Sequence, residues 1–151
     1  MRIGRLTCLL VCLNFAIIAL SSPVYGVDED LVAIQTILLE ARGESYLGQV
    51  AVGEVIRNRA FKTSIGIIEI CLAPFQFSCW NNARKAEKAI NRISGDEWQI
   101  ASKAWEESKH TNYSKGATYY LAKNKLKYLP GWVNNLEETL RIDHHTFYKE
   151  L

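Results

Sequence analysis

Residues 29–59 read EDLVAIQTILLEARGESYLGQVAVGEVIRNR, and this stretch decides the fold because it predicts two consecutive helices. Apolar residues recur at helical spacing across residues 31–41, and most of the intervening positions are apolar too. We therefore expect a helix over residues 29–42 that is central and buried nearly all round. Gly43 suits the position just past its end. A second helix is expected over residues 47–61.

The remainder of the chain predicts shorter elements. We expect a helix or strand at residues 65–72 and an ordered loop at 73–81. Two more helices are expected at 82–93 and 96–110, and two short strands at 116–123 and 139–148. We expect residues 123–127 to be a basic, solvated loop. No internal repeat or Pro-rich linker divides the chain, and 151 residues suit one domain. The expected fold class is α+β, mostly α, with a small β element.

The amino-terminal residues have the pattern of an export signal. Two arginines precede an apolar run over residues 6–20, and small residues lead up to Gly26. We expect residues 1–26 to be a cleaved signal peptide and residues 27–151 to be the functional domain. The protein would then act in the periplasm or the extracellular cell wall, without stable membrane association. An uncleaved membrane anchor is the alternative, although the run is shorter than the about 20 residues of a spanning helix.

The charge balance argues against a nucleic-acid partner. The chain has 18 Lys and Arg residues and 16 Asp and Glu residues. Loss of Arg2 and Arg5 with the signal leaves 16 of each, a net charge near zero. Nucleic-acid-binding domains are usually clearly basic, whereas an uncharged glycan requires no net charge.

Two of the four cysteines remain after signal cleavage. Cys71 and Cys79 would then lie in an oxidising compartment, so we predict a disulfide between them that fixes the short loop they enclose. Two buried free thiols are the alternative. A zinc site is disfavoured because no second pair lies at ligand spacing.

Glu40 is the strongest candidate for chemistry, because it lies near the end of the most apolar predicted helix. A carboxyl group among apolar side chains is harder to ionise, and it retains the proton that a general acid must donate. Most glycosidases add a second carboxylate, for which Glu44 is the first candidate and Glu54 the second. The structural alternative for Glu40 is a surface carboxylate paired with Arg42 or Arg59.

Other kinds of catalytic centre find little support. His144 and His145 are adjacent, so on a strand they point to opposite faces and do not easily share a metal. No nucleophile elbow surrounds a serine, and no glycine-rich loop for phosphate is present. We expect neither a metal nor a cofactor.

The segment Glu40–Arg59 closely resembles the signature of the SleB-like cell wall hydrolases, a family that includes spore-cortex lytic enzymes. Three later segments resemble further motifs of that family in the same order: Pro74–Ser78, Ala117–Tyr120 and His145–Tyr148. The likeness spans about residues 29–149. Two positions depart from the family pattern. Ser45 replaces a frequent proline, and Tyr119 replaces the usual histidine.

The resemblance implies a lysozyme-like fold related to lytic transglycosylases. It also implies cleavage of peptidoglycan between N-acetylmuramic acid and N-acetylglucosamine, with Glu40 as the catalytic residue. On this basis we expect a lytic transglycosylase that leaves 1,6-anhydromuramyl ends. The alternatives are a hydrolytic muramidase, with Glu44 or Glu54 as the base for water, and an inactive peptidoglycan-binding module. The residues expected to bind substrate are Gln76, Ser78, Tyr119, Tyr120 and Tyr148.

Overall fold

The computed structural model describes residues 28–122 and 128–151. The signal peptide and the basic loop predicted above lie outside these residues. The described elements are α1 (Glu29–Ala41), α2 (Tyr46–Thr63), α3 (Ile67–Leu72), the 3₁₀ helix η1 (Ser78–Asn81), α4 (Ala83–Ile90), α5 (Gly95–Ser108), β1 (Tyr119–Ala122), the 3₁₀ helix η3 (Gly131–Asn135), β2 (Leu136–Ile142) and β3 (His145–Glu150). The predicted α+β class, mostly α with a small sheet, is confirmed. No helix in the described ranges is both long and apolar enough to cross a membrane.

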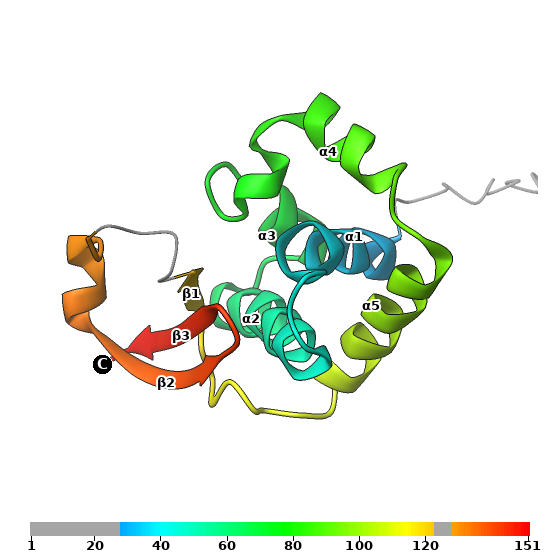
Figure 1. The fold of residues 1–151 in the computed structure, drawn as a ribbon. Coiled ribbons are helices and arrows are strands. Elements are labelled where there is room, and N and C mark those ends of the chain that lie inside the picture. Colours follow the sequence, from blue (N-terminus) through cyan, green and yellow to red (C-terminus); the bar gives the residue numbers. More distant parts are fainter. Residues whose placement is uncertain (1–27, 123–127) are drawn as a thin grey trace, which may run out of the picture.

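Helix α1 occupies the centre of the helical part, with α2, α3 and α5 around it (Figure 1). Its start is capped by Asp28, whose carboxylate accepts a hydrogen bond from the backbone N–H of Asp30 (3.0 Å). Ile37 and Leu38 are completely buried, and each contributes about 1.5–3 kcal/mol by leaving water. The prediction of burial nearly all round is only partly confirmed, because six of the 13 residues are buried, whereas Ile34 and Leu39 are half-buried and Leu31 is exposed.

Helix α2 carries two buried glycines that permit close packing. A Cβ atom added at Gly53 would lie 2.9 Å from Ser108 of α5. Glycine in a helix interior costs about 0.5–1 kcal/mol relative to alanine, and here the close approach of α2 to α5 explains its presence.

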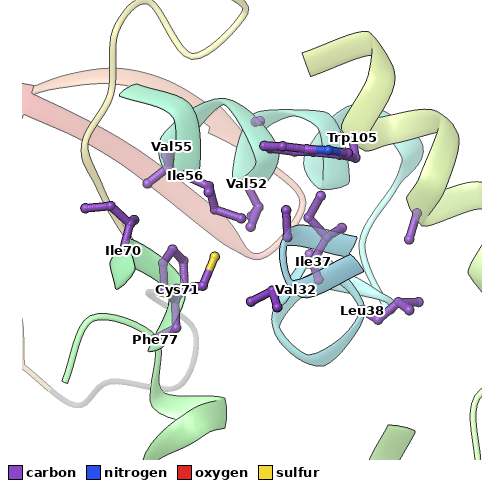
Figure 2. Packing of buried hydrophobic residues seen from close by; sticks show 14 of the residues in the cluster. Val32, Ile37, Leu38, Val52, Val55, Ile56, Ile70, Cys71, Phe77 and Trp105 are labelled. Carbon is purple, nitrogen blue, oxygen red and sulfur yellow. The ribbon is translucent and has the colours of Figure 1, made fainter. Parts of the chain in front are cut away.

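The hydrophobic core lies between α1, α2, α3 and α5. Figure 2 shows Ile37 of α1, Val52 and Ile56 of α2 and Trp105 of α5 directed toward one another. Phe77, from the loop before η1, enters the same core. The core therefore fixes this loop relative to α1.

The boundaries of α4 and α5 follow from their capping residues. Asn82 accepts a hydrogen bond from the backbone N–H of Lys85 and starts α4. Ser94 and Glu97 form a reciprocal capping box at the start of α5. The predicted break between these helices is confirmed, and the run at 65–72 is the helix α3.

The sheet has the strand order β1-β3-β2, and all neighbours are antiparallel. The single strand expected over 139–148 is wrong, because β2 and β3 form a hairpin with a turn at Asp143 and His144. Asp143 has a φ of 46°, a left-handed conformation that Asp tolerates better than most residues. The turn contains no glycine or proline, so the sequence offers no signal that one strand ends there and another begins.

The β2–β3 turn is clasped to the loop between α1 and α2. The Asp143 carboxylate accepts a hydrogen bond from the backbone N–H of Ser45 (2.7 Å). In return, the Glu44 carboxylate accepts one from the backbone N–H of His144 (2.9 Å). The absence of a side chain at Gly48 is required, because a Cβ atom there would lie 2.9 Å from the Asp143 carboxylate. This clasp joins the sheet to the start of α2.

We expect Asp143→Asn to lower the melting temperature at pH 7 by a few degrees, about the effect of 1 kcal/mol in a domain of this size. The hydrogen bonds from Ser45 hold the pKa of Asp143 below its usual 3.8. A lowered folded-state pKa gives stability that is present above about pH 3.8 and is lost as the pH falls through the folded-state value. Thermal melts of both proteins from pH 7 to pH 2 should therefore converge at low pH. A pH-independent difference would contradict this account.

Candidate active site

The carboxylate of Glu40 lies at the carboxyl end of α1 and accepts hydrogen bonds from three donors. Its Oε1 atom accepts from the backbone N–H of Cys79 (2.9 Å) and from the Ser78 hydroxyl (3.3 Å). Its Oε2 atom accepts from the Tyr120 hydroxyl (3.1 Å). The expected apolar setting is therefore only part of the picture, because three polar groups point at this half-buried carboxylate. Among the described residues, neither Arg42 nor Arg59 forms an ion pair with it.

Glu40 opens into a cleft of about 730 Å³. One wall comes from the loop before η1 together with η1 and α4, and the other comes from β1 and the start of β3. The residues lining the cleft are Leu39, Glu40, Arg59, Phe75, Gln76, Phe77, Ser78, Cys79, Asn81, Asn82, Lys85, Ala86, Ala89, Tyr120, Leu121, Ala122 and His145. Glu40 is the one carboxylate among these described residues.

The loop that carries two of the donors begins with a tight turn. The backbone N–H of Gln76 donates to the carbonyl of Ala73 (3.2 Å), and Pro74 and Phe75 occupy the two central positions. Phe75 has a φ of 63°, as the third position of a type II turn requires. A left-handed conformation costs a non-glycine residue about 1–2 kcal/mol.

The side chains that follow the turn anchor the loop to the core. Phe77 is 1% exposed, and the indole N–H of Trp80 donates to the Thr36 hydroxyl on α1 (2.9 Å). These anchors flank Ser78 and Cys79 on both sides. The two donors are therefore held against the end of α1.

Arg59 of α2 links the two walls of the cleft. Its Nε–H donates to the carbonyl of Thr118 (2.6 Å), and its Nη1–H donates to the carbonyl of Gln76 (3.1 Å). The guanidinium also lies 4.8 Å from the centre of the Phe77 ring, a cation–π contact. Burial lowers the pKa of Arg59, while the carbonyls and the ring stabilise its charge. Arg59 is therefore a half-buried residue that connects the two walls of the cleft, and not a surface ion-pair partner of Glu40.

Tyr120 projects from β1 into a cluster of rings. Its ring centre lies 5.0 Å from that of His145 and 5.7 Å from that of Phe147. Burial and the neighbouring Glu40 carboxylate raise the pKa of Tyr120 well above its usual 10.0. The phenol therefore remains protonated and keeps its hydrogen atom available for Glu40.

The predicted disulfide is wrong, because Cys71 and Cys79 are free thiols. The Thr36 side chain acts on the pKa of Cys71, whereas Glu40 and, more weakly, Cys71 act on the pKa of Cys79. Burial raises the pKa of Cys71 to about 11, and burial together with the Glu40 charge raises the pKa of Cys79 further. The loop is fixed by Phe77, Trp80 and Arg59 instead.

The two secondary acidic candidates lie outside the cleft lining. Glu44 belongs to the clasp with the β2–β3 turn. Glu54 is 1% exposed and accepts hydrogen bonds from the Thr111 hydroxyl and from the backbone N–H groups of Tyr113 and Ser114 (2.8, 2.8 and 2.7 Å). Both carboxylates hold chain segments together.

The expected substrate-binding residues divide into two groups. Gln76, Ser78 and Tyr120 line the cleft. Tyr119 points away from it, where its hydroxyl donates to Glu150 (3.0 Å) and its ring packs against Trp132. Tyr148 is buried in a small second core with Leu121 and Val133. Tyr119 and Tyr120 differ because adjacent side chains face opposite sides of a strand.

Several cleft residues were not expected from the sequence. Asn81, Asn82 and Lys85 line the wall formed by η1 and α4. In the sequence, they lie three to seven residues after the Pro74–Ser78 segment, and this proximity was the signal that could have found them. Within residues 28–122 and 128–151, no three metal-ligating side chains gather into a possible metal site.

Comparison with known proteins identifies a related family and related structures. The family model described as Cell Wall Hydrolase matches residues 43–148. The crystal structure of the catalytic domain of the Bacillus cereus SleB protein matches with a TM-score of 0.64 and 25% identity, over 83% of this chain and 94% of that one. The catalytic domain of the germination-specific lytic transglycosylase SleB from Bacillus anthracis matches with a TM-score of 0.62 and 24% identity, over 85% and 100%. No curated protein sequence matches significantly.

We expect Glu54→Gln to lower the free energy of unfolding by about 2–3 kcal/mol, because a side-chain amide would turn an N–H donor toward buried donors. Urea unfolding at pH 7 measures the change. Glu87→Gln, at an exposed position of α4, is the matched control and should stay within about 0.5 kcal/mol of wild type. A Glu54 variant as stable as that control would rule out the structural role assigned to this carboxylate.

Proposed function

This chain belongs to the cell wall hydrolase family, and from that premise we propose that it is a lytic transglycosylase that cleaves peptidoglycan glycan strands with Glu40 as general acid and base. The family match covers most of the described domain, and the Bacillus cereus match is to a catalytic domain. The fold is lysozyme-like, as the family resemblance implied. The substrate is peptidoglycan, the bond cut joins N-acetylmuramic acid to N-acetylglucosamine, and the export signal expected at residues 1–26 fits a substrate outside the cytoplasmic membrane.

The proposed reaction begins with proton transfer from Glu40 to the glycosidic oxygen. The bond between that oxygen and the anomeric carbon of N-acetylmuramic acid then breaks, and N-acetylglucosamine leaves with the proton. The C6 hydroxyl of the same muramyl residue attacks the anomeric carbon and returns its proton to Glu40. The product carries a 1,6-anhydro ring, and the enzyme recovers its starting state.

The contacts of Glu40 favour Oε2 as the atom that carries this proton. Oε1 faces the backbone N–H of Cys79, which can only donate. Oε2 faces the Tyr120 hydroxyl, which can turn to accept a hydrogen bond when the carboxyl group is protonated. Tyr120 thus supports both protonation states, and Cys79 and Ser78 fix the orientation of the carboxyl group.

Among the described residues, the cleft lining contains a single carboxylate, and this observation supports transglycosylation over hydrolysis. Inverting and retaining glycosidases use a pair of carboxylates within about 10 Å of each other. Here Glu44 and Glu54 are both engaged in holding backbone segments. A nucleophile supplied by the substrate itself removes the need for a second carboxylate.

We expect Glu40→Gln to lower the rate of peptidoglycan cleavage at least 100-fold, the usual contribution of a general acid–base group. The amide retains the shape and the acceptor for the Cys79 N–H, so the melting temperature should change little. Glu106→Gln, on the surface of α5, is the matched control.

Mass spectrometry of the soluble products gives the reaction class. Anhydromuramyl ends from the wild-type protein support transglycosylation, and reducing ends would show a hydrolytic muramidase. A wild-type protein that binds peptidoglycan without releasing any fragment would instead be a binding module. A Glu40→Gln variant within tenfold of wild type would remove Glu40 from the mechanism.

We expect Tyr120→Phe to reduce kcat about tenfold, the value of one hydrogen bond to a charged group. Tyr119→Phe offers a matched control on the adjacent residue, because its hydroxyl bonds Glu150 outside the cleft. Steady-state rates on soluble glycan strands compare the two variants. Equal rates for both would show that the Tyr120 contact with Glu40 has no catalytic value.

A further inference from the structure

Phe75 has an unusual position for a large apolar side chain. It is 87% exposed and lines the cleft that contains Glu40. An exposed phenylalanine contributes almost nothing to the core, so its packing within the chain does not account for it. A contact with a ligand in the cleft would account for an aromatic ring at this position.

The backbone at Phe75 adds a second observation. The turn of residues 73–76 is closed by the hydrogen bond from Gln76 to Ala73, and Phe75 occupies the position where a positive φ favours glycine or asparagine. Glycine would occupy this position without backbone strain. Strain of this kind persists where the surrounding structure imposes it, and it clusters at ligand-binding sites.

The turn holds the ring in a fixed place. Pro74 has a fixed φ just before Phe75, and the Gln76 carbonyl accepts a hydrogen bond from the half-buried Arg59. The backbone N–H of Phe75 faces the Asn81 side chain (3.4 Å). The ring is therefore presented on a braced turn, three residues before Ser78, which bonds Glu40.

We propose that Phe75 forms a sugar-stacking subsite for an N-acetylhexosamine of the glycan strand. The axial C–H groups of such a ring give it an apolar face that an exposed aromatic ring can cover. Its hydroxyl and acetamido groups project from the edge, and the same cleft is lined by the polar side chains of Asn82 and Lys85. This inference rests on the proposed function, since it assumes that a glycan enters the cleft.

The test compares substitutions of Phe75 for stability, for binding and for turnover. Phe75→Gly removes the ring and relieves the backbone, so the melting temperature should stay within about 3 °C of wild type or rise. Phe75→Tyr keeps a flat ring of similar size. Phe75→Leu keeps an apolar side chain without a flat face, and it separates stacking from general hydrophobic contact.

The substrate is a preparation of soluble, peptide-free glycan strands. We expect Phe75→Gly to raise KM about tenfold, the scale of one aromatic contact, while kcat changes less than threefold. Binding of the same strands to the Glu40→Gln protein, with and without Phe75→Gly, should weaken by the same factor. Phe75→Tyr should match wild type, and Phe75→Leu should resemble Phe75→Gly.

The outcomes separate this inference from the proposed function. If the wild-type protein cleaves the strands and Phe75→Gly has a KM within twofold of wild type, the subsite is refuted while the enzymatic function stands. A Phe75→Leu variant with wild-type KM refutes stacking in particular. If the wild-type protein binds the strands without cleaving them, the proposed function fails, and the binding measurements still decide whether Phe75 contacts the sugar.

Discussion

The half-buried charge of Arg59 is the constraint on which the arrangement of the cleft depends. A guanidinium removed from water must have its N–H groups satisfied, and Arg59 meets this demand with carbonyls from two segments distant in the chain. One segment leads into η1 and the donors Ser78 and Cys79, and the other leads into β1 and Tyr120. Because both are anchored to the same side chain of α2, their positions are coupled. The positions of the three donors around Glu40 thus depend on the core packing of α1 and α2 and on the hydrogen bonds of Arg59.

The helices and the position of Glu40 could be predicted from the sequence, because helical periodicity is a local signal that the core then enforces. The β2–β3 hairpin could not, because its turn depends on Asp143 in a left-handed conformation and on the clasp with Ser45. The choice between a disulfide and free thiols could not be made from the sequence for a similar reason. Cysteine spacing does not say what surrounds each sulfur, and here Thr36 lies beside Cys71 and Glu40 beside Cys79.

The motif from Glu40 to Arg59 combines two kinds of acidic residue that look alike in the sequence. Glu44 and Glu54 satisfy backbone N–H groups of the β2–β3 turn and of the segment after α5, whereas Glu40 faces a cleft with side-chain donors on it. The difference lies in what each carboxylate meets from elsewhere in the chain. Residues 78–79 and 120 supply those contacts for Glu40, and the local sequence around it contains no trace of them. The same reasoning explains why Tyr120 and Tyr119, neighbours on β1, have unrelated surroundings.

The clasp between residues 44–45 and 143–144 joins positions about 100 apart in the chain, and Tyr120 reaches Glu40 across 80 residues. Contacts of such long range form late in folding, because closing a large loop costs conformational entropy before the contact can form. A chain still emerging from the ribosome therefore has α1 and α2 before it has the wall formed by β1. The Glu40 carboxylate acquires its full set of donors only when synthesis of the described residues is nearly complete.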